Sequence, residues 1–154
     1  MAEFGFTNRY YTMAEKKAPR GIRNNNPLNI RKGNSWKGEK DVQTDPAFEQ
    51  FVSMQWGIRA GFKILKNYMT GYGGRTKALT NVHDIIYRWA PPSENNSQSY
   101  VDTVCRFSGL HPFERLQFTD RTKMIALVDG MIRVECGEPV SIDLIASAYD
   151  LLTF

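Results

Sequence analysis

The sequence predicts a mainly α-helical (α+β) domain with a small antiparallel β element near its N-terminal end. From Ile58 onward, apolar residues recur at the spacings of one helix face. Residues 28 to 52 instead place β-forming residues between turn signals, in LNIRKG, DVQT and FEQFV. The chain has 154 residues, of which 42% are hydrophobic, so it can form one domain with a core.

Five helices are expected after the β element. The first is marked by Ile58 to Met69 and ends at the glycines of TGYGG, and the second covers Val82 to Trp89 and ends at the prolines of WAPP. The third is marked by Val101 to Cys105, and the last two cover residues 120 to 135 and 141 to 152. Residues 1 to 19 are expected to form a flexible arm, and residues 20 to 154 a single domain.

The composition argues against a membrane span, a metal site and a cofactor. The chain has no apolar run of about 18 residues, and its N-terminus lacks the basic-then-apolar plan of a signal peptide. Cys105 and Cys136 are interpreted as two small buried thiols, and His83 and His111 match no ligand spacing. We therefore expect a monomer that is made in a cytoplasm. Its net charge of +4 suits any anionic polymer, bacterial wall and nucleic acid included.

Three stretches concentrate polar side chains that a core does not need. In RGIRNNNPLNIR, Asn24, Asn25, Asn26 and Asn29 surround a proline. Asparagines often form turns by bonding their own backbone, but carboxamides also suit the hydroxyl and N-acetyl groups of sugars.

The second stretch is RWAPPSENNSQSY. Trp89 is interpreted either as a core residue or as a wall on which a sugar stacks, with Glu94, Asn95 and Tyr100 supplying polar groups. Glu94 is expected at the start of a helix, where capping explains it as well as catalysis does.

The third stretch is GMIRVECGEP, in which Glu135 falls on the apolar stripe of Met124, Val128, Met131 and Ile132. Burial and the negative end of a helix dipole both disfavour the charged form of a carboxylate, which is how a general acid is made. The alternative interpretation is an ordinary exposed helix end, followed by the turn residues Gly137 and Pro139.

Together, RGIRNNNPLNIR, Trp36, FEQF, WGIRAG, IIYRWAPPSENNSQSYVDTV and VECG resemble the phage-associated lysozyme-like proteins, which include endolysins and virion-associated wall-degrading enzymes. The resemblance covers about residues 20 to 137. The sequence departs from the family pattern at Leu28, where glycine is usual, and at Cys136, where asparagine is usual. The resemblance implies a lysozyme-like helical fold that acts on peptidoglycan during phage lysis or infection. The protein would then act in the cell wall after release, or be carried in the virion.

The order of the motifs suggests a circular permutation. In the common lytic transglycosylase layout, a helix ending in a catalytic glutamate precedes the other motifs. Here only Glu3 and Glu15 lie upstream of Asn24, whereas KMIALVDGMIRVECG, with the expected ending, comes last. We therefore expect Glu135 to replace the usual N-terminal glutamate, and to face one cleft together with NNPLN and the segment from Trp89 to Tyr100.

The predicted enzyme is a lytic transglycosylase or a muramidase with Glu135 as the proton donor. The second carboxylate that hydrolysis would need is Glu49 or Glu94, with Glu94 the second catalytic candidate. The predicted sugar-binding residues are Asn25, Asn26, Asn29, Arg31, Glu49, Trp89, Asn95 and Tyr100.

Two rival functions remain open at the level of sequence. One is a phage structural or sugar-binding protein that keeps the fold without the chemistry. The other is a nucleic-acid binder that uses Arg20, Arg23, Arg31, Lys32 and Trp36. The balance of 20 basic against 16 acidic residues argues against nucleic acid as the partner.

Overall fold

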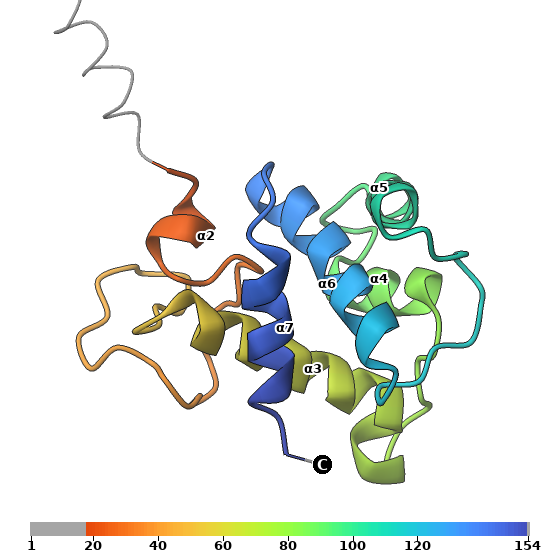
Figure 1. The fold of residues 1–154 in the computed structure, drawn as a ribbon, viewed down its shortest axis with the longest axis horizontal. Coiled ribbons are helices and arrows are strands. Elements are labelled where there is room, and N and C mark those ends of the chain that lie inside the picture. The colour runs from red at the N-terminus through yellow and green to blue at the C-terminus, as the bar shows by residue number, and fades with distance from the viewer. Residues whose placement is uncertain (1–17, 154) are drawn as a thin grey trace, which may run out of the picture.

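The computed structural model describes residues 18–153, whose secondary structure is almost entirely helical (Figure 1). The helices in this range are α2 (Arg20–Arg23), α3 (Met54–Gly74), α4 (Val82–Trp89), α5 (Ser97–Ser108), α6 (Arg121–Cys136) and α7 (Ile142–Asp150). The mainly α-helical class is therefore confirmed. The expected flexible arm falls almost wholly on residues 1–17, outside the described residues, and the single-domain boundary stays a prediction.

Helix α6 packs against α5 on one side and against α7 and α2 on the other (Figure 1). The predicted stripe of Met124, Val128, Met131 and Ile132 is fully buried, as expected for the face of a core helix. At Gly130 the helix approaches α5 so closely that an added Cβ would lie 3.1 Å from the Cα of Val104. This contact holds α6 and α5 together as one unit. The C-terminal end of α6 lies near α2.

Helix α3 supplies the second large part of the core and packs against α7 and α4. Its predicted apolar face, Ile58, Phe62, Leu65 and Met69, is buried. Right-handed geometry stops after Thr70, because Gly71, Tyr72 and Gly73 have φ values of 62°, 54° and 71°. The glycines of TGYGG therefore end the regular helix as predicted, since left-handed backbone costs glycine little.

The small antiparallel sheet predicted over residues 28 to 52 is not confirmed. Within residues 18–153, this region has only two isolated antiparallel bridges, between Arg31 and Phe48 and between Glu39 and Phe51. Gly33 and Gly38, with φ values of 142° and 82°, lie in the bends and turns between Arg31 and Glu39. Side chains rather than a strand ladder therefore hold most of this loop.

A polar network joins α2 to the same loop. Arg20 donates to both oxygens of Asp45 at 2.6 Å, and Asn24 donates to Asp45 at 2.9 Å. Gln50 in turn donates from its side chain to the side-chain Oδ1 of Asn24 at 3.0 Å. Because Asn24, Asp45 and Gln50 are all buried, these bonds satisfy groups that would otherwise be costly to bury. The network fixes the turn that follows α2.

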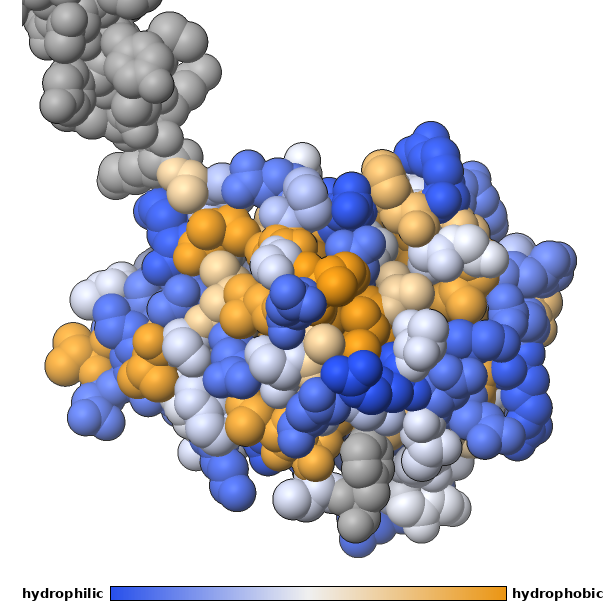
Figure 2. Space-filling model, viewed as in Figure 1, coloured by the Kyte–Doolittle hydropathy of each residue, from blue (hydrophilic) through white to orange (hydrophobic). Residues whose placement is uncertain are grey.

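Figure 2 shows apolar residues gathered across the middle of one face, over α7 and beside it, with hydrophilic residues around them. Ile142, the first residue of α7, is 50% exposed. In residues 18–153 no helix is both long enough and apolar enough to cross a lipid bilayer.

The Asp45 network predicts a specific acid sensitivity of the fold. Hydrogen bonds from Arg20 lower the pKa of Asp45 well below its ordinary value. Because the unfolded chain titrates near a pKa of about 3.9, the stabilisation is present above about pH 4 and is lost as the pH falls below it.

Asp45→Asn is therefore expected to be less stable than the parent protein at pH 7, and the difference should shrink between pH 5 and pH 2. Urea unfolding across this pH range measures it. A stability difference that stays constant over the whole range would contradict the assigned role of the carboxylate.

Candidate active site

The turn after α2 is built from asparagines that serve two different purposes. Asn26 is fully buried, donates to the carbonyls of Ile30 and Glu49 and accepts from the Ile30 amide. Asn25 donates to the Phe51 carbonyl at 3.0 Å. The predicted sugar-binding role of Asn25 and Asn26 is therefore not supported, because both amides bond the protein's own backbone, as the alternative turn interpretation allowed.

Asn29 has a different orientation. Its φ of 53° lies in the left-handed region, which asparagine tolerates better than most residues. Its amide donates at 3.1 Å to Oε1 of Glu135 and at 3.2 Å to the Glu135 carbonyl. A turn near the start of the chain thus holds the end of α6 across 106 residues of sequence.

Two glycines of WGIRAG let α3 approach this turn. A Cβ added to Gly57 would lie 1.9 Å from the Asn25 carbonyl oxygen, and one added to Gly61 would lie 2.2 Å from the Leu28 side chain. Such distances are far below van der Waals contact, so any larger residue would push α3 away from the turn. The motif therefore works through close packing beside the site.

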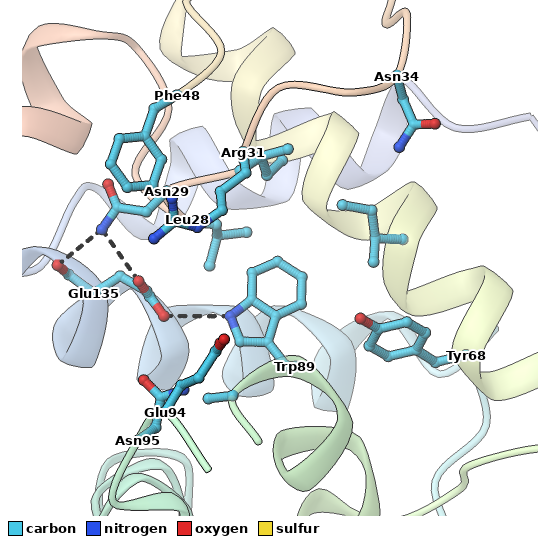
Figure 3. Close-up of a pocket in the computed structure, with 13 residues that line it drawn as sticks. Leu28, Asn29, Arg31, Asn34, Phe48, Tyr68, Trp89, Glu94, Asn95 and Glu135 are labelled. Carbon is cyan, nitrogen blue, oxygen red and sulfur yellow. Dashed lines mark hydrogen bonds between the residues drawn. The ribbon is translucent and has the colours of Figure 1, made fainter. Parts of the chain in front are cut away.

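The Glu135 carboxylate is the meeting point of three segments. Figure 3 shows its hydrogen bonds to two of them, at Asn29 and at Trp89. Oε1 accepts from Asn29, whereas Oε2 accepts from Trp89 Nε1 at 3.2 Å and from the Tyr100 hydroxyl at 2.8 Å. Trp89 is the last residue of α4, and Tyr100 lies in the first turn of α5. The structure therefore brings together the three parts that were predicted to meet, namely NNPLN, the segment from Trp89 to Tyr100, and Glu135.

Cys136, the residue after Glu135, also contacts the turn after α2. Its thiol donates to the Pro27 carbonyl at 3.1 Å, and burial together with Glu135 and Glu138 raises its pKa to about 11. Cys136 is buried and Cys105 half-buried, and both are free thiols. Cys136 therefore adds a contact between the end of α6 and the turn.

A pocket of about 800 Å³ opens beside Glu135. The predicted site residues that line it are Asn29, Arg31, Trp89, Glu94, Asn95 and Glu135. Tyr100 is buried behind the carboxylate, and its pKa is raised well above the ordinary value by burial and by Glu135. Tyr100 therefore remains a protonated hydroxyl at neutral pH.

Glu94 and Glu49 occupy different environments from those expected. Glu94 lies in the turn before α5, and the cap of that helix is Asn96, whose side chain accepts from the Ser99 amide. The capping role expected of Glu94 was therefore wrong, and its exposed side chain lines the pocket. Glu49 is 5% exposed, does not line the pocket, and has its pKa raised by burial and by Glu39.

Sequence reasoning missed several residues that complete the pocket, including Asn34, Phe48, Ile64 and Tyr68. The Arg31 guanidinium lies 4.9 Å from the centre of the Phe48 ring, which holds this cation at the pocket wall. The Tyr68 ring packs edge-on to Trp89, with 6.5 Å between ring centres. Tyr68 follows Ile64 by four residues on α3, and this second apolar spacing beside the core stripe was the available signal.

Comparisons with known proteins place the chain beside a bacteriophage protein. It is similar to Protein P5 of Pseudoalteromonas phage PM2, with 38% identity over 139 residues that cover 87% of this chain and 82% of that protein. No protein-family model matches the chain. The expected phage character is thereby supported, and the resemblance to lysozyme-like proteins stays a prediction.

The hydrogen bond between Tyr100 and Glu135 makes a prediction that is independent of any activity. A double-mutant cycle of Tyr100→Phe and Glu135→Gln should show a coupling of about 1–3 kcal/mol in the free energy of unfolding, because the bond is short and partly buried. Denaturant unfolding of the parent, both single variants and the double variant measures the coupling. Strictly additive effects would show that the two groups do not interact in solution.

Proposed function

We propose that this chain, which belongs to the same family as Protein P5 of Pseudoalteromonas phage PM2, cleaves the glycan strand of bacterial peptidoglycan with Glu135 as proton donor. The observation that carries the proposal is the Glu135 carboxylate, held by Asn29, Trp89 and Tyr100 at the wall of an open pocket. General-acid catalysis requires a carboxyl group that is held in one position at the wall of a cleft, and these three partners hold Glu135 in that way.

The lining of the pocket supports a sugar as the ligand. Asn34 and Asn95 offer carboxamides, which pair with hydroxyl and N-acetyl groups. The aromatic rings of Phe48, Tyr68 and Trp89 offer apolar surface for sugar rings. A pocket of about 800 Å³ has room for more than one sugar unit.

In the proposed reaction, protonated Glu135 donates to the oxygen that links two sugars, and an oxocarbenium-like centre develops on the ring that loses this bond. Tyr100 suits both states of the acid, because a hydroxyl can donate to a carboxylate and accept from a carboxylic acid. The Trp89 indole and the Asn29 amide nitrogen only donate, so they hold the carboxylate in position once the proton has left.

Two courses complete the reaction. If Glu94 activates water, a hydroxyl adds to the anomeric carbon and the product has a reducing end. If it does not, the sugar's own hydroxyl attacks the anomeric carbon and returns its proton to Glu135, which closes an anhydro ring. The exposed position of Glu94 and the location of Glu49 outside the pocket support the second course.

The proposal includes a circular permutation of the lysozyme-like domain. The end of α6 lies against α2 and the turn after it, through the Asn29–Glu135 and Cys136–Pro27 contacts. These are the two ends that an unpermuted ancestor would have joined directly. Their proximity supports the permutation, and the relative of Pseudoalteromonas phage PM2 fits the phage setting that the proposal needs.

One observation favours a non-catalytic, sugar-binding alternative. The three hydrogen bonds to Glu135 also tie the turn after α2, α4 and α5 to α6, which would explain a partly buried glutamate without chemistry. Activity measurements on variants separate the two functions.

Glu135→Gln is expected to reduce the release of soluble glycan fragments from purified peptidoglycan by about 100-fold or more, because glutamine cannot donate the proton. Glutamine would also set its own amide against one of the three donors, at a cost of about 1–3 kcal/mol in stability. Activity should therefore be assayed well below the melting temperature.

Ile145→Val is the matched control, since it removes one methyl group from a fully buried site on α7 and costs about 0.5–1.5 kcal/mol. It should keep normal turnover. Near-normal turnover by Glu135→Gln would contradict the assignment of Glu135 as proton donor. If Glu94→Gln is inactive while Glu135→Gln is active, Glu94 is the proton donor instead.

A further inference from the structure

A cluster of positive charge lies on one flank of α3 and on the loop that packs against it. Arg59, Lys63 and Lys66 follow each other by four and three residues, which places them on one side of the helix. Lys37 precedes Gly38, which packs so tightly on Trp56 that an added Cβ would lie 2.3 Å from the indole ring. The Arg59 guanidinium lies 5.5 Å from the centre of the same ring. Trp56 therefore holds the Lys37 loop next to Arg59.

Arg59 is unusual for a cation at this degree of burial. Its residue is 9% exposed, yet among residues 18–153 it forms no ion pair and its side chain donates no hydrogen bond. The Arg59 nitrogens nevertheless reach solvent. Within residues 18–153, the side-chain nitrogen that is both buried and without a hydrogen-bond partner belongs to Trp36 and not to Arg59. A poorly compensated buried charge is costly, so an anion that reaches these nitrogens would be favourable.

The neighbouring lysines share this shortage of acceptors. Neither Lys37 nor Lys63 forms an ion pair with any residue in the described range. Burial, together with repulsion from Lys66, Arg59 and Lys37, lowers the pKa of Lys63. Lys37, Arg59 and Lys63 therefore form a local excess of positive charge that no ion pair within residues 18–153 neutralises.

The cluster flanks a continuation of the candidate active site. A second pocket of about 470 Å³ shares Asn34, Ile64 and Tyr68 with the first, and extends the groove towards Trp36 and Tyr72. Asn67 lines this second pocket and follows Lys63 by one helical turn. A chain that lies along the groove would pass beside the cations.

We propose that Lys37, Arg59 and Lys63 bind carboxylates of the peptide stems attached to the peptidoglycan strand, while the strand itself lies in the groove. This inference rests on the proposed function and assigns a second recognition element to the same substrate. Carboxylates fit the site because a few clustered cations beside a sugar-sized groove match discrete acidic groups spaced along a glycan. A long phosphate backbone would call for a continuous basic stripe.

Wall binding by the full chain tests the site, with Glu135→Gln as the background so that the wall is not consumed. Adding Lys37→Gln and Lys63→Gln should weaken binding to purified sacculi by about five- to tenfold, because two charge pairs near the surface are lost. Amidation of the wall carboxylates should weaken binding of the background protein by at least as much, because it also removes the partner of Arg59. On amidated sacculi the two lysine substitutions should have no further effect.

The matched control adds Arg75→Gln and Arg115→Gln, which remove the same charge from exposed positions elsewhere, and it should bind as the background does. Equal weakening by the control pair would reduce the effect to net charge and overturn the site. Binding that survives amidation and is instead displaced by inorganic phosphate would also overturn it. If the parent protein cleaves walls normally but neither the lysine substitutions nor amidation weakens binding, the carboxylate site is rejected and the proposed function stands. Carboxylate-dependent binding by a parent protein that cleaves nothing would keep the site and reject the proposed function.

Discussion

The carboxylate of Glu135 is the constraint on which the arrangement of this site depends. It accepts hydrogen bonds from Asn29, Trp89 and Tyr100, which belong to three separate segments of the chain. The closest of these in sequence is 35 residues away and the farthest 106. Because a partly buried carboxylate is costly without donors, each segment has to be in place for the others to be stable. The pocket wall and the end of α6 are therefore one structural unit.

The same geometry serves folding and the proposed chemistry at once. A proton donor has to be held in place both before and after it gives up its proton, so it needs one neighbour that can hydrogen-bond to both states. Tyr100 is that neighbour, since its hydroxyl faces Oε2 at 2.8 Å and burial keeps it protonated. Gly57 and Gly61 contribute by having no side chain, which leaves room for the turn that carries Asn29. A fold built this way has little freedom to vary around the pocket.

The parts of this arrangement that follow from local periodicity were predictable from the sequence. The stripe of α6 is regular, so the burial of its apolar residues and the inward side of Glu135 could be read directly. The roles of Asn25 and Asn29 could not, since both have a φ of 53° but tertiary contacts decide which carboxamide faces the pocket. The predicted sheet is not confirmed for a related reason, because side-chain bonds such as those of Asn26 hold the loop beside two isolated antiparallel bridges. The burial of Arg59 could not be predicted either, because a charged residue on a helix is ordinarily solvated.

The central claim, that this site cuts the glycan strand of peptidoglycan, is tested most directly by mass analysis of the fragments that the protein releases from purified peptidoglycan. The account predicts disaccharide-containing fragments that end in an anhydro ring on the muramic acid. Fragments with an ordinary reducing end would keep the glycosidic cleavage and assign the second step to water. Release of peptides from intact glycan strands, or no release at all from a folded protein, would contradict it.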